Sequence, residues 1–288
     1  MVADHNPTGT GVRSTTAVDA SDPSVIAPLA VLLRHARAEA SRYQQARPFP
    51  HAVFDGLFEN RRLLAVHDEL PDRSVEGWRS YDTTHEWKYV FDKVHRLGPA
   101  ARGLALELSS SEFVQFLETL TGIDGLLPDP HLRQAGYMVA PHGGFLAPHT
   151  DFTTLGDLPL VRRVNALVYL NEGWRYEWGG QLELWRSLDD GPEVEIVPTL
   201  GRLVVFSTPG AAHGHPKPVV APDDRSRVCF SAYYYTADDS TVPIERQLVL
   251  WGDEGRRSVR LRHGISLLSP PLLTNTYHRR RQARRTVR

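Results

Sequence analysis

The segment from Leu132 to Tyr235 consists of short apolar or alternating runs separated by turn-forming residues. In QLELW, for example, Leu182 and Leu184 share one face, because side chains alternate along a strand. Many short strands with regular turn signals are typical of an antiparallel barrel or jelly roll. The strands of this segment do not alternate with helices, which argues against a doubly wound sheet. The predicted strands are LRQAGYMVA, FLAPHTDF, RVNALVYLN, QLELW, EVEIVP, RLVVFS, HPKPVV and RVCFSAYYYT.

The chain before this segment has the spacing of helices instead. Apolar residues recur at helical intervals from Ile26 onward, and Pro48 and Pro50 stop that helix. A run of serines before 111–121 can cap a further helix. The segment HAVFDGLF (51–58) reads as a short strand and turn. Helices are predicted over 26–45, 59–70, 100–108 and 111–121.

These patterns predict one domain with two appended segments. Residues 1–24 are rich in small and polar residues and are expected to be a disordered leader. Residues 25–240 form the domain, helical over 25–130 and β-barrel over 131–240. Residues 241–288 form a C-terminal extension, whose last eleven residues carry six arginines and no acidic residue.

Composition limits the classes of partner. The net charge of −1 gives no overall field that would recruit nucleic acid or an anionic membrane. The chain lacks an apolar run of about 18–20 residues, so no membrane partner is expected. Cys229 is the only cysteine, which excludes an intrachain disulfide. The N-terminal residues do not have the pattern of a secretory signal. A cytoplasmic location is therefore expected.

The strongest chemical signal is His149-Thr150-Asp151. Residues two apart on a strand point to the same face, so the imidazole and the carboxylate can converge on one cation. A third ligand should come from a neighbouring strand, and His213 follows the apolar strand 202–207. Two histidines and one carboxylate form the facial triad of non-haem Fe(II) oxygenases, whose open positions suit a bidentate keto acid and O₂.

The third ligand has a competitor two residues away. His213 and His215 are separated by Gly214, so both can face inward on one strand. Counting from Phe206 in the preceding strand favours His213 as the ligand. His215 is then expected to support a ligand or to face the substrate.

Arg227 opens the last strong strand, RVCFSAYYYT. A guanidinium group matches a carboxylate with two parallel hydrogen bonds, which suits the distal carboxylate of 2-oxoglutarate. Arg225 is the alternative, but it lies in the turn APDDRS and is expected to be solvated.

With these residues in place, the stretch from Phe49 to Thr236 resembles the prolyl-4-hydroxylase-like branch of the 2-oxoglutarate/Fe(II) oxygenases. The resemblance is carried by PFPHAVFDGLF, LTGIDGLLPDP, GGFLAPHTDF, RRVNALVYLNEGW, WGGQLELW, GRLVVFS and HGHPKPV followed by RVCFSAYYYT. It implies a double-stranded β-helix (jelly-roll, cupin-like) core after N-terminal helices. It also implies Fe(II), 2-oxoglutarate and O₂ as cofactor and cosubstrates.

The resemblance assigns residues one by one. It puts the iron ligands at His149, Asp151 and His213 and the keto-acid arginine at Arg227. HGHPKPV has one residue more than the family's usual H-x-V-x-P-V. A tyrosine on the preceding strand often touches the keto acid in this family, and Tyr137 is the nearest match. Its spacing is longer than usual.

Asn165 is a further candidate, from the pattern of its strand. It is a polar residue in the otherwise apolar run RVNALVYLN, which suggests either contact with the keto acid or burial with a backbone hydrogen bond.

The implied reaction is hydroxylation of an unactivated C–H bond in an amino acid, a peptidyl residue or a natural-product intermediate, with release of succinate and CO₂. Desaturation or epoxidation by the same machinery is the nearest alternative. A nucleic-acid demethylase is disfavoured, because Tyr233 stands where such enzymes carry a second arginine. A barrel that binds a metal or ligand without catalysis is the remaining alternative. The arginine-rich tail could meet an acidic partner such as a carrier protein.

Overall fold

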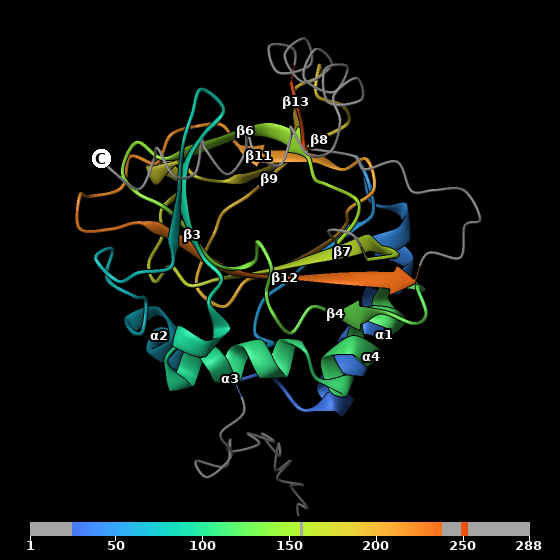
Figure 1. The fold of residues 1–288 in the computed structure, drawn as a ribbon. Coiled ribbons are helices and arrows are strands. Elements are labelled where there is room, and N and C mark those ends of the chain that lie inside the picture. The colour runs from blue at the N-terminus through green and yellow to red at the C-terminus, as the bar shows by residue number, and fades with distance from the viewer. Residues whose placement is uncertain (1–24, 156–157, 238–248, 253–288) are drawn as a thin grey trace, which may run out of the picture.

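The computed structural model describes residues 25–155, 158–237 and 249–252. Within these ranges, thirteen strands form one antiparallel sheet that curls on itself, with four α-helices packed beneath it (Figure 1). The predicted jelly-roll core preceded by helices is confirmed. The predicted leader and the arginine-rich tail lie outside the described residues.

The four predicted helices are present. The cap of the last helix matches its sequence, because the Ser110 hydroxyl accepts a hydrogen bond from Phe113 N at 3.3 Å, and Gly122 ends the helix in a left-handed conformation with φ 71°. The helices are α1 Leu29–Gln45, α2 Asn60–Asp68, α3 Pro99–Leu108 and α4 Ser111–Thr121, with 3₁₀ turns at Val94–Arg96 and Tyr176–Trp178.

The sheet is arranged in two layers. Its strands follow the order β1-β10-β7-β12-β5-β3-β6-β11-β8-β9. Figure 1 shows β7 and β12 in the layer next to the helices, and β6, β11, β8 and β9 in the layer above. The strands are β1 His51–Phe54, β2 Trp78–Asp82, β3 Glu86–Phe91, β4 Leu127–Pro128, β5 Gly136–Ala140, β6 Phe145–Thr150, β7 Leu160–Tyr169, β8 Leu182–Trp185, β9 Pro192–Ile196, β10 Leu203–Ser207, β11 Ala212–His215, β12 Arg227–Ala237 and β13 Leu250–Trp251.

Strand β3 joins the two layers. It pairs with β5 through Tyr89 and Val139, and with β6 through Glu86 and Leu146. In Figure 1 this strand rises from the lower layer to the upper one. The β2–β3 hairpin lies within residues 25–130, which the sequence pattern assigned to helices, so that part of the prediction was wrong.

Two other differences concern single strands. The run HPKPVV is not a strand beyond His215, because Pro216 and Pro218 have no backbone N–H to donate to a neighbour. Conversely, β13 lies in the segment assigned to a C-terminal extension, yet Leu250 and Trp251 pair with β6. The barrel therefore continues beyond residue 240.

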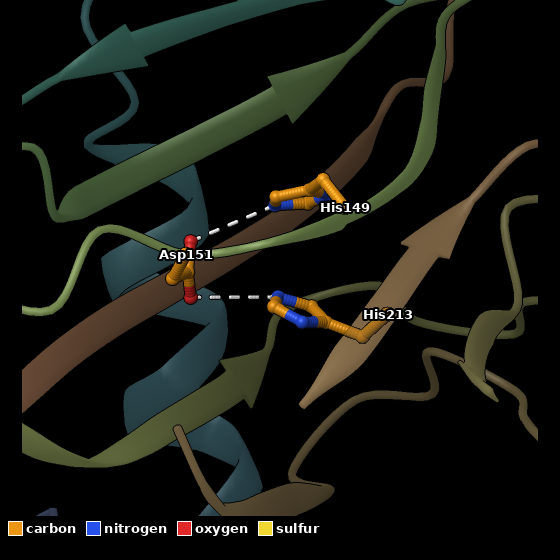
Figure 2. A group of neighbouring side chains, drawn as sticks. All are labelled: His149, Asp151 and His213. Carbon is orange, nitrogen blue, oxygen red and sulfur yellow. Dashed lines mark ion pairs between the residues drawn. The ribbon is translucent and has the colours of Figure 1, made fainter. Parts of the chain in front are cut away.

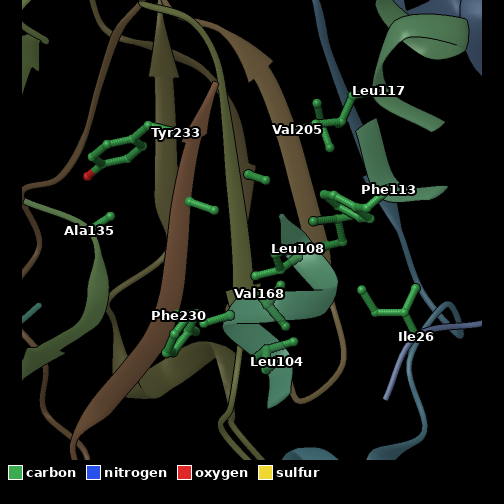
Figure 3. Close-up of a cluster of buried hydrophobic side chains, with 14 of the residues drawn as sticks. Ile26, Leu104, Leu108, Phe113, Leu117, Ala135, Val168, Val205, Phe230 and Tyr233 are labelled. Carbon is green, nitrogen blue, oxygen red and sulfur yellow. The ribbon is translucent and has the colours of Figure 1, made fainter. Parts of the chain in front are cut away.

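The main hydrophobic core lies between the helices and the lower layer (Figure 3). On β7, Val168 packs toward Leu104 and Leu108 of α3, whereas Asn165 and Leu167 line the cavity on the other face of the sheet. Both faces of β7 are therefore buried, one by apolar packing and one by the functional site. None of the described helices is long and apolar enough to cross a membrane.

The two leucines of α3 give a matched test of this core. Leu104→Ala should lower the free energy of unfolding by about 2–5 kcal/mol, because Leu104 is fully buried against the sheet. Leu106→Ala on the same helix should change it by about 0.5 kcal/mol or less, since that side chain is 66% exposed. Chemical denaturation of both variants measures the difference, and equal losses would place the core elsewhere.

Candidate metal centre and cosubstrate cavity

The pairing of β6 with β11 brings the two candidate histidines together. In this antiparallel pair His213 lies directly opposite His149, and their ring centroids are 4.5 Å apart. Asp151 follows the end of β6 and turns its carboxylate toward both rings (Figure 2). Three residues that the sequence predicted as a ligand set therefore meet at one point.

Both imidazoles present the same nitrogen to that point. Nδ1 of His149 lies 3.0 Å from the carbonyl oxygen of Ala147, and Nδ1 of His213 lies 3.0 Å from that of Ala211. A carbonyl can only accept, so each Nδ1 carries the proton. Each Nε2 consequently keeps its lone pair, as a metal-binding histidine requires.

The geometry of the three groups fits a divalent metal. Each Nε2 is 3.6 Å from an oxygen of Asp151, Oδ1 for His149 and Oδ2 for His213. The ligand atoms all lie within 4.8 Å of one another. Two imidazole nitrogens and one carboxylate oxygen on one side of a cation leave the opposite side open, which is the arrangement of non-haem Fe(II) sites.

Asp151 is held from behind by two further side chains. Asn165 Nδ2 donates to Asp151 Oδ2 at 2.9 Å, and a guanidinium nitrogen of Arg162 lies 3.1 Å from the same oxygen. The amide oxygen of Asn165 accepts hydrogen bonds from Arg162 Nε at 2.9 Å and from the Thr208 hydroxyl at 3.2 Å. One hydrogen bond and one ion pair therefore engage Oδ2, which leaves Oδ1 the less encumbered oxygen for a metal.

A β-bulge makes this arrangement possible. Arg162 and Asn165 are three residues apart, so they would face opposite sides of a regular strand. On β12, however, Tyr234 pairs with Val164 and the next residue, Tyr235, pairs with Arg162, which leaves Arg163 as an extra residue. Because of this extra residue, the side chain of Arg162 lies on the same face of β7 as the side chain of Asn165.

The surroundings set the ionisation of the candidate ligands. Burial by itself would raise the pKa of Asp151, but the positive charge of Arg162 holds that pKa well below its ordinary value. Burial lowers the pKa of His213 to about 4. At neutral pH the site therefore offers the Asp151 carboxylate and a neutral His213 imidazole, the protonation states that metal binding needs.

Gly214 explains how β11 approaches β6 so closely. A Cβ atom at this position would lie 2.7 Å from the carbonyl oxygen of Leu146 and 2.9 Å from that of Ala147. The neighbouring His215 also faces the cavity, but it pairs with Leu146 rather than with His149. Among the described residues, its buried Nδ1 has no hydrogen-bond partner.

Arg227 lines the same cavity as the three candidate ligands. The guanidinium is buried, its Nε donates to the carbonyl oxygen of Gly180 at 2.6 Å, and a terminal nitrogen donates to the hydroxyl of Tyr169 at 3.1 Å. A side chain at Gly180 would collide with Arg227, since the added Cβ would lie 2.9 Å from the arginine Cδ. Arg225 instead bonds to the carbonyl oxygen of Glu172 in an exposed turn.

The structure does not bring Tyr137 to this cavity. Its hydroxyl donates to the carbonyl oxygen of Val66 at 2.5 Å, and its ring packs edge-on against Phe230 in the main core. Met138, the next residue on β5, faces the cavity instead. Asn165 lines the cavity, and it is bonded to the side chains of Asp151, Arg162 and Thr208 rather than to the backbone.

Three residues near the site were missed by sequence reasoning. Arg162 is hidden by the bulge, although an arginine inside an apolar strand is itself a signal of a buried polar partner. Tyr169 is the last residue of β7, and its hydroxyl accepts a hydrogen bond from Arg227. Trp251 belongs to β13 and packs against His149, with ring centroids 5.2 Å apart; only the pairing of β13 with β6 reveals it.

Comparisons with known proteins agree with this geometry. Residues 134–235 match the family model of the 2OG-Fe(II) oxygenase superfamily. The chain is 23% identical over 210 residues to the prolyl 3,4-dihydroxylase OGFOD1 of Ostreococcus tauri, a match that covers 66% of this chain and 38% of that protein. The chain therefore spans well under half the length of that curated relative.

Two solved structures have a similar fold. A prolyl-4-hydroxylase of Pseudomonas putida matches with a TM-score of 0.50 and 20% identity, over 70% of this chain and 98% of that one. A prolyl 4-hydroxylase of Phytophthora capsici matches with a TM-score of 0.51 and 20% identity, over 76% of this chain and 69% of that one. At this level of identity the likeness concerns the jelly-roll fold alone.

Histidine variants test which imidazole binds the metal. His213→Ala should abolish tight binding of Fe(II) or Ni(II), because one of three ligand atoms is removed. His215→Ala should leave metal affinity close to that of the unmodified protein, since His215 pairs away from His149. Anaerobic calorimetric titration of both variants measures this, and the reverse result would move the ligand to His215.

Asn165→Leu tests the support behind Asp151. The variant should still bind metal, but about ten- to a hundredfold more weakly, because the hydrogen bond that orients the carboxylate is lost. Thr208→Val, which removes only a bond to Asn165, should have a smaller effect. A metal affinity unchanged in Asn165→Leu would mean that Arg162 alone orients the carboxylate.

Proposed function

We propose that this protein is a 2-oxoglutarate-dependent hydroxylase of unactivated C–H bonds, in keeping with the match of residues 134–235 to the family model of the 2OG-Fe(II) oxygenase superfamily. The observation that carries the proposal is the convergence of His149, Asp151 and His213 in one cavity that also contains Arg227. The triad accounts for the metal, and the arginine accounts for an anionic cosubstrate.

In this proposal His149 Nε2, His213 Nε2 and an oxygen of Asp151 would hold Fe(II). Fe(II) held there would supply the redox chemistry that couples oxidation of 2-oxoglutarate by O₂, giving succinate and CO₂, to insertion of one oxygen atom into a substrate C–H bond. Asp151 occupies a ligand position that a halide would need, so hydroxylation is favoured over halogenation. Arg162 and Asn165 keep the carboxylate in its metal-binding orientation.

Arg227 binds the distal carboxylate of 2-oxoglutarate. Its Nε is fixed by Gly180, and one terminal nitrogen is fixed by Tyr169, so the side chain loses little freedom when the cosubstrate arrives. Burial raises the pKa of Tyr169 above its ordinary value, which keeps the phenol neutral beside the guanidinium. The arginine retains its positive charge for the carboxylate.

The substrate would enter the same cavity. Apart from the proposed ligands and Arg227, its lining includes polar and aromatic residues, among them Tyr81, Gln134, Phe152, Tyr233 and Trp251. Such a lining suits an amino acid, a peptidyl residue or a polar natural-product intermediate. The prolyl hydroxylase activity named for the relative in Ostreococcus tauri supports a peptidyl substrate.

Anaerobic spectroscopy and succinate assays test the proposed reaction directly. Fe(II) and 2-oxoglutarate together should produce a weak visible charge-transfer band, which Asp151→Ala should lose. Exposure to O₂ should then form succinate from 2-oxoglutarate, faster when a substrate is present. A protein that binds Fe(II) but neither binds nor consumes 2-oxoglutarate would be a metal-binding barrel instead.

Arginine variants test the cosubstrate contact. Arg227→Met should raise the apparent 2-oxoglutarate requirement by about ten- to a hundredfold, because a charge-assisted pair is worth roughly 1.5–3 kcal/mol. Arg227→Lys should be intermediate, since it keeps the charge and loses the planar fork. Metal affinity should persist in both. Arg225→Ala is the control and should behave normally, and damage confined to that variant would transfer the role to Arg225.

A further inference from the structure

A second cation lines the cosubstrate cavity and has no place in the proposed reaction. Lys88 and Glu86 on β3 both face the cavity and form an ion pair at 3.0 Å. Their side chains are only 14% and 11% exposed. Removing both charges from water costs free energy that their mutual attraction recovers only in part. A charged group of a ligand in the same cavity would stabilise this pair further.

Strand register puts Lys88 beside Arg227. On β5, Ala140 pairs with Arg227 of β12, and Val139 pairs with Tyr89 of β3, so Lys88 follows next to Ala140 on the other side. Two strand spacings of about 4.8 Å separate the backbones by roughly 10 Å. Since the side chain of Ala140 is only a methyl group, the two long cationic side chains reach past it into the same cavity.

The electrostatics of Cys229 agree with this placement. Burial raises the pKa of the Cys229 thiol, whereas the positive charges of Arg227 and Lys88 both lower it. The two cations therefore act on one part of the cavity. We name this part the cationic end and define it by Arg227, Lys88, Glu86 and His215.

Two features of the cationic end favour the binding of an anion. The charges of Arg227 and Lys88 are offset by one carboxylate, Glu86, which leaves one unit of positive charge. In addition, the Nδ1 atom of His215 is buried there without a hydrogen-bond partner among the described residues. One carboxylate from a ligand would balance the charge and offer an acceptor to the imidazole.

We infer that Lys88 is a second anchor for the distal carboxylate of 2-oxoglutarate, acting beside Arg227. The inference rests on the proposed function, because it takes 2-oxoglutarate as the cosubstrate. In the absence of the cosubstrate, Glu86 keeps the buried ammonium paired. When the carboxylate is bound, the ammonium contacts both anions.

The decisive measurement compares two keto acids that differ only at the far end. 2-Oxoglutarate and 2-oxopentanoate have chains of equal length, and only the first has a distal carboxylate. Binding of each to the Ni(II)-loaded full-length protein can be followed by calorimetry, because Ni(II) supports no turnover. Lys88→Met should weaken 2-oxoglutarate binding about tenfold or more and leave 2-oxopentanoate binding unchanged.

A double variant separates contact from screening. If Lys88 contacts the carboxylate itself, Glu86→Gln/Lys88→Met should bind 2-oxoglutarate as weakly as, or only slightly better than, Lys88→Met. Full recovery in the double variant would overturn the inference, because Lys88 would then only neutralise Glu86. Unchanged 2-oxoglutarate affinity in Lys88→Met would overturn it as well.

Two controls keep the result interpretable. Lys93→Met removes a lysine from the same segment whose side chain is 41% exposed and pairs with Asp92, so its cosubstrate affinity should be normal. Ni(II) affinity of Lys88→Met should equal that of the unmodified protein, which shows an intact metal centre. If the unmodified protein itself fails to bind 2-oxoglutarate, the proposed function fails, whereas equal binding by the unmodified protein and Lys88→Met removes only the role of Lys88.

Discussion

The structure depends on one strand pairing, that of β6 with β11, because it sets two imidazoles opposite each other. An antiparallel pair brings side chains from distant parts of the chain to a fixed separation, and here the partners are His149 and His213. The close approach of the strands requires Gly214, where any side chain would meet the backbone of β6. The third group, Asp151, needs only to follow His149 by two residues. The geometry of the site is thus a property of the barrel backbone.

A buried carboxylate beside two histidines would be unstable without compensation, and β7 supplies it. The strand is buried on both faces, so its side chains divide their roles by direction: Val168 packs on the helices, whereas Asn165 and Arg162 support Asp151. The guanidinium of Arg162 also stacks on the ring of Tyr233, 3.4 Å from the ring centroid. The packed helices hold β7 in place, and β7 in turn holds the carboxylate.

The sequence predicted the residues whose role follows from strand alternation and missed those that depend on irregular backbone. His149 and Asp151 share a face by simple periodicity, and the four helices follow from apolar spacing and capping. Arg162 escaped notice because a bulge changes its face. The β2–β3 hairpin was missed because its strand EWKYVF mixes charged and aromatic residues, a pattern that follows from lining a polar cavity rather than packing a core. Tyr137 was misplaced because one residue of register separates the core face of β5 from its cavity face.

The charges of the cavity are distributed unevenly, and this asymmetry orients a dicarboxylate. Near the metal centre the negative charge of Asp151 is matched by Arg162, so that end gains positive charge only from a bound metal. At the cationic end, Arg227 and Lys88 outweigh Glu86 before any ligand is bound. A keto acid can chelate a metal only through its keto and adjacent carboxylate oxygens, so its distal carboxylate must point away from the metal. The cavity offers uncompensated positive charge in that direction, which favours a cosubstrate with two carboxylates over one with a single carboxylate.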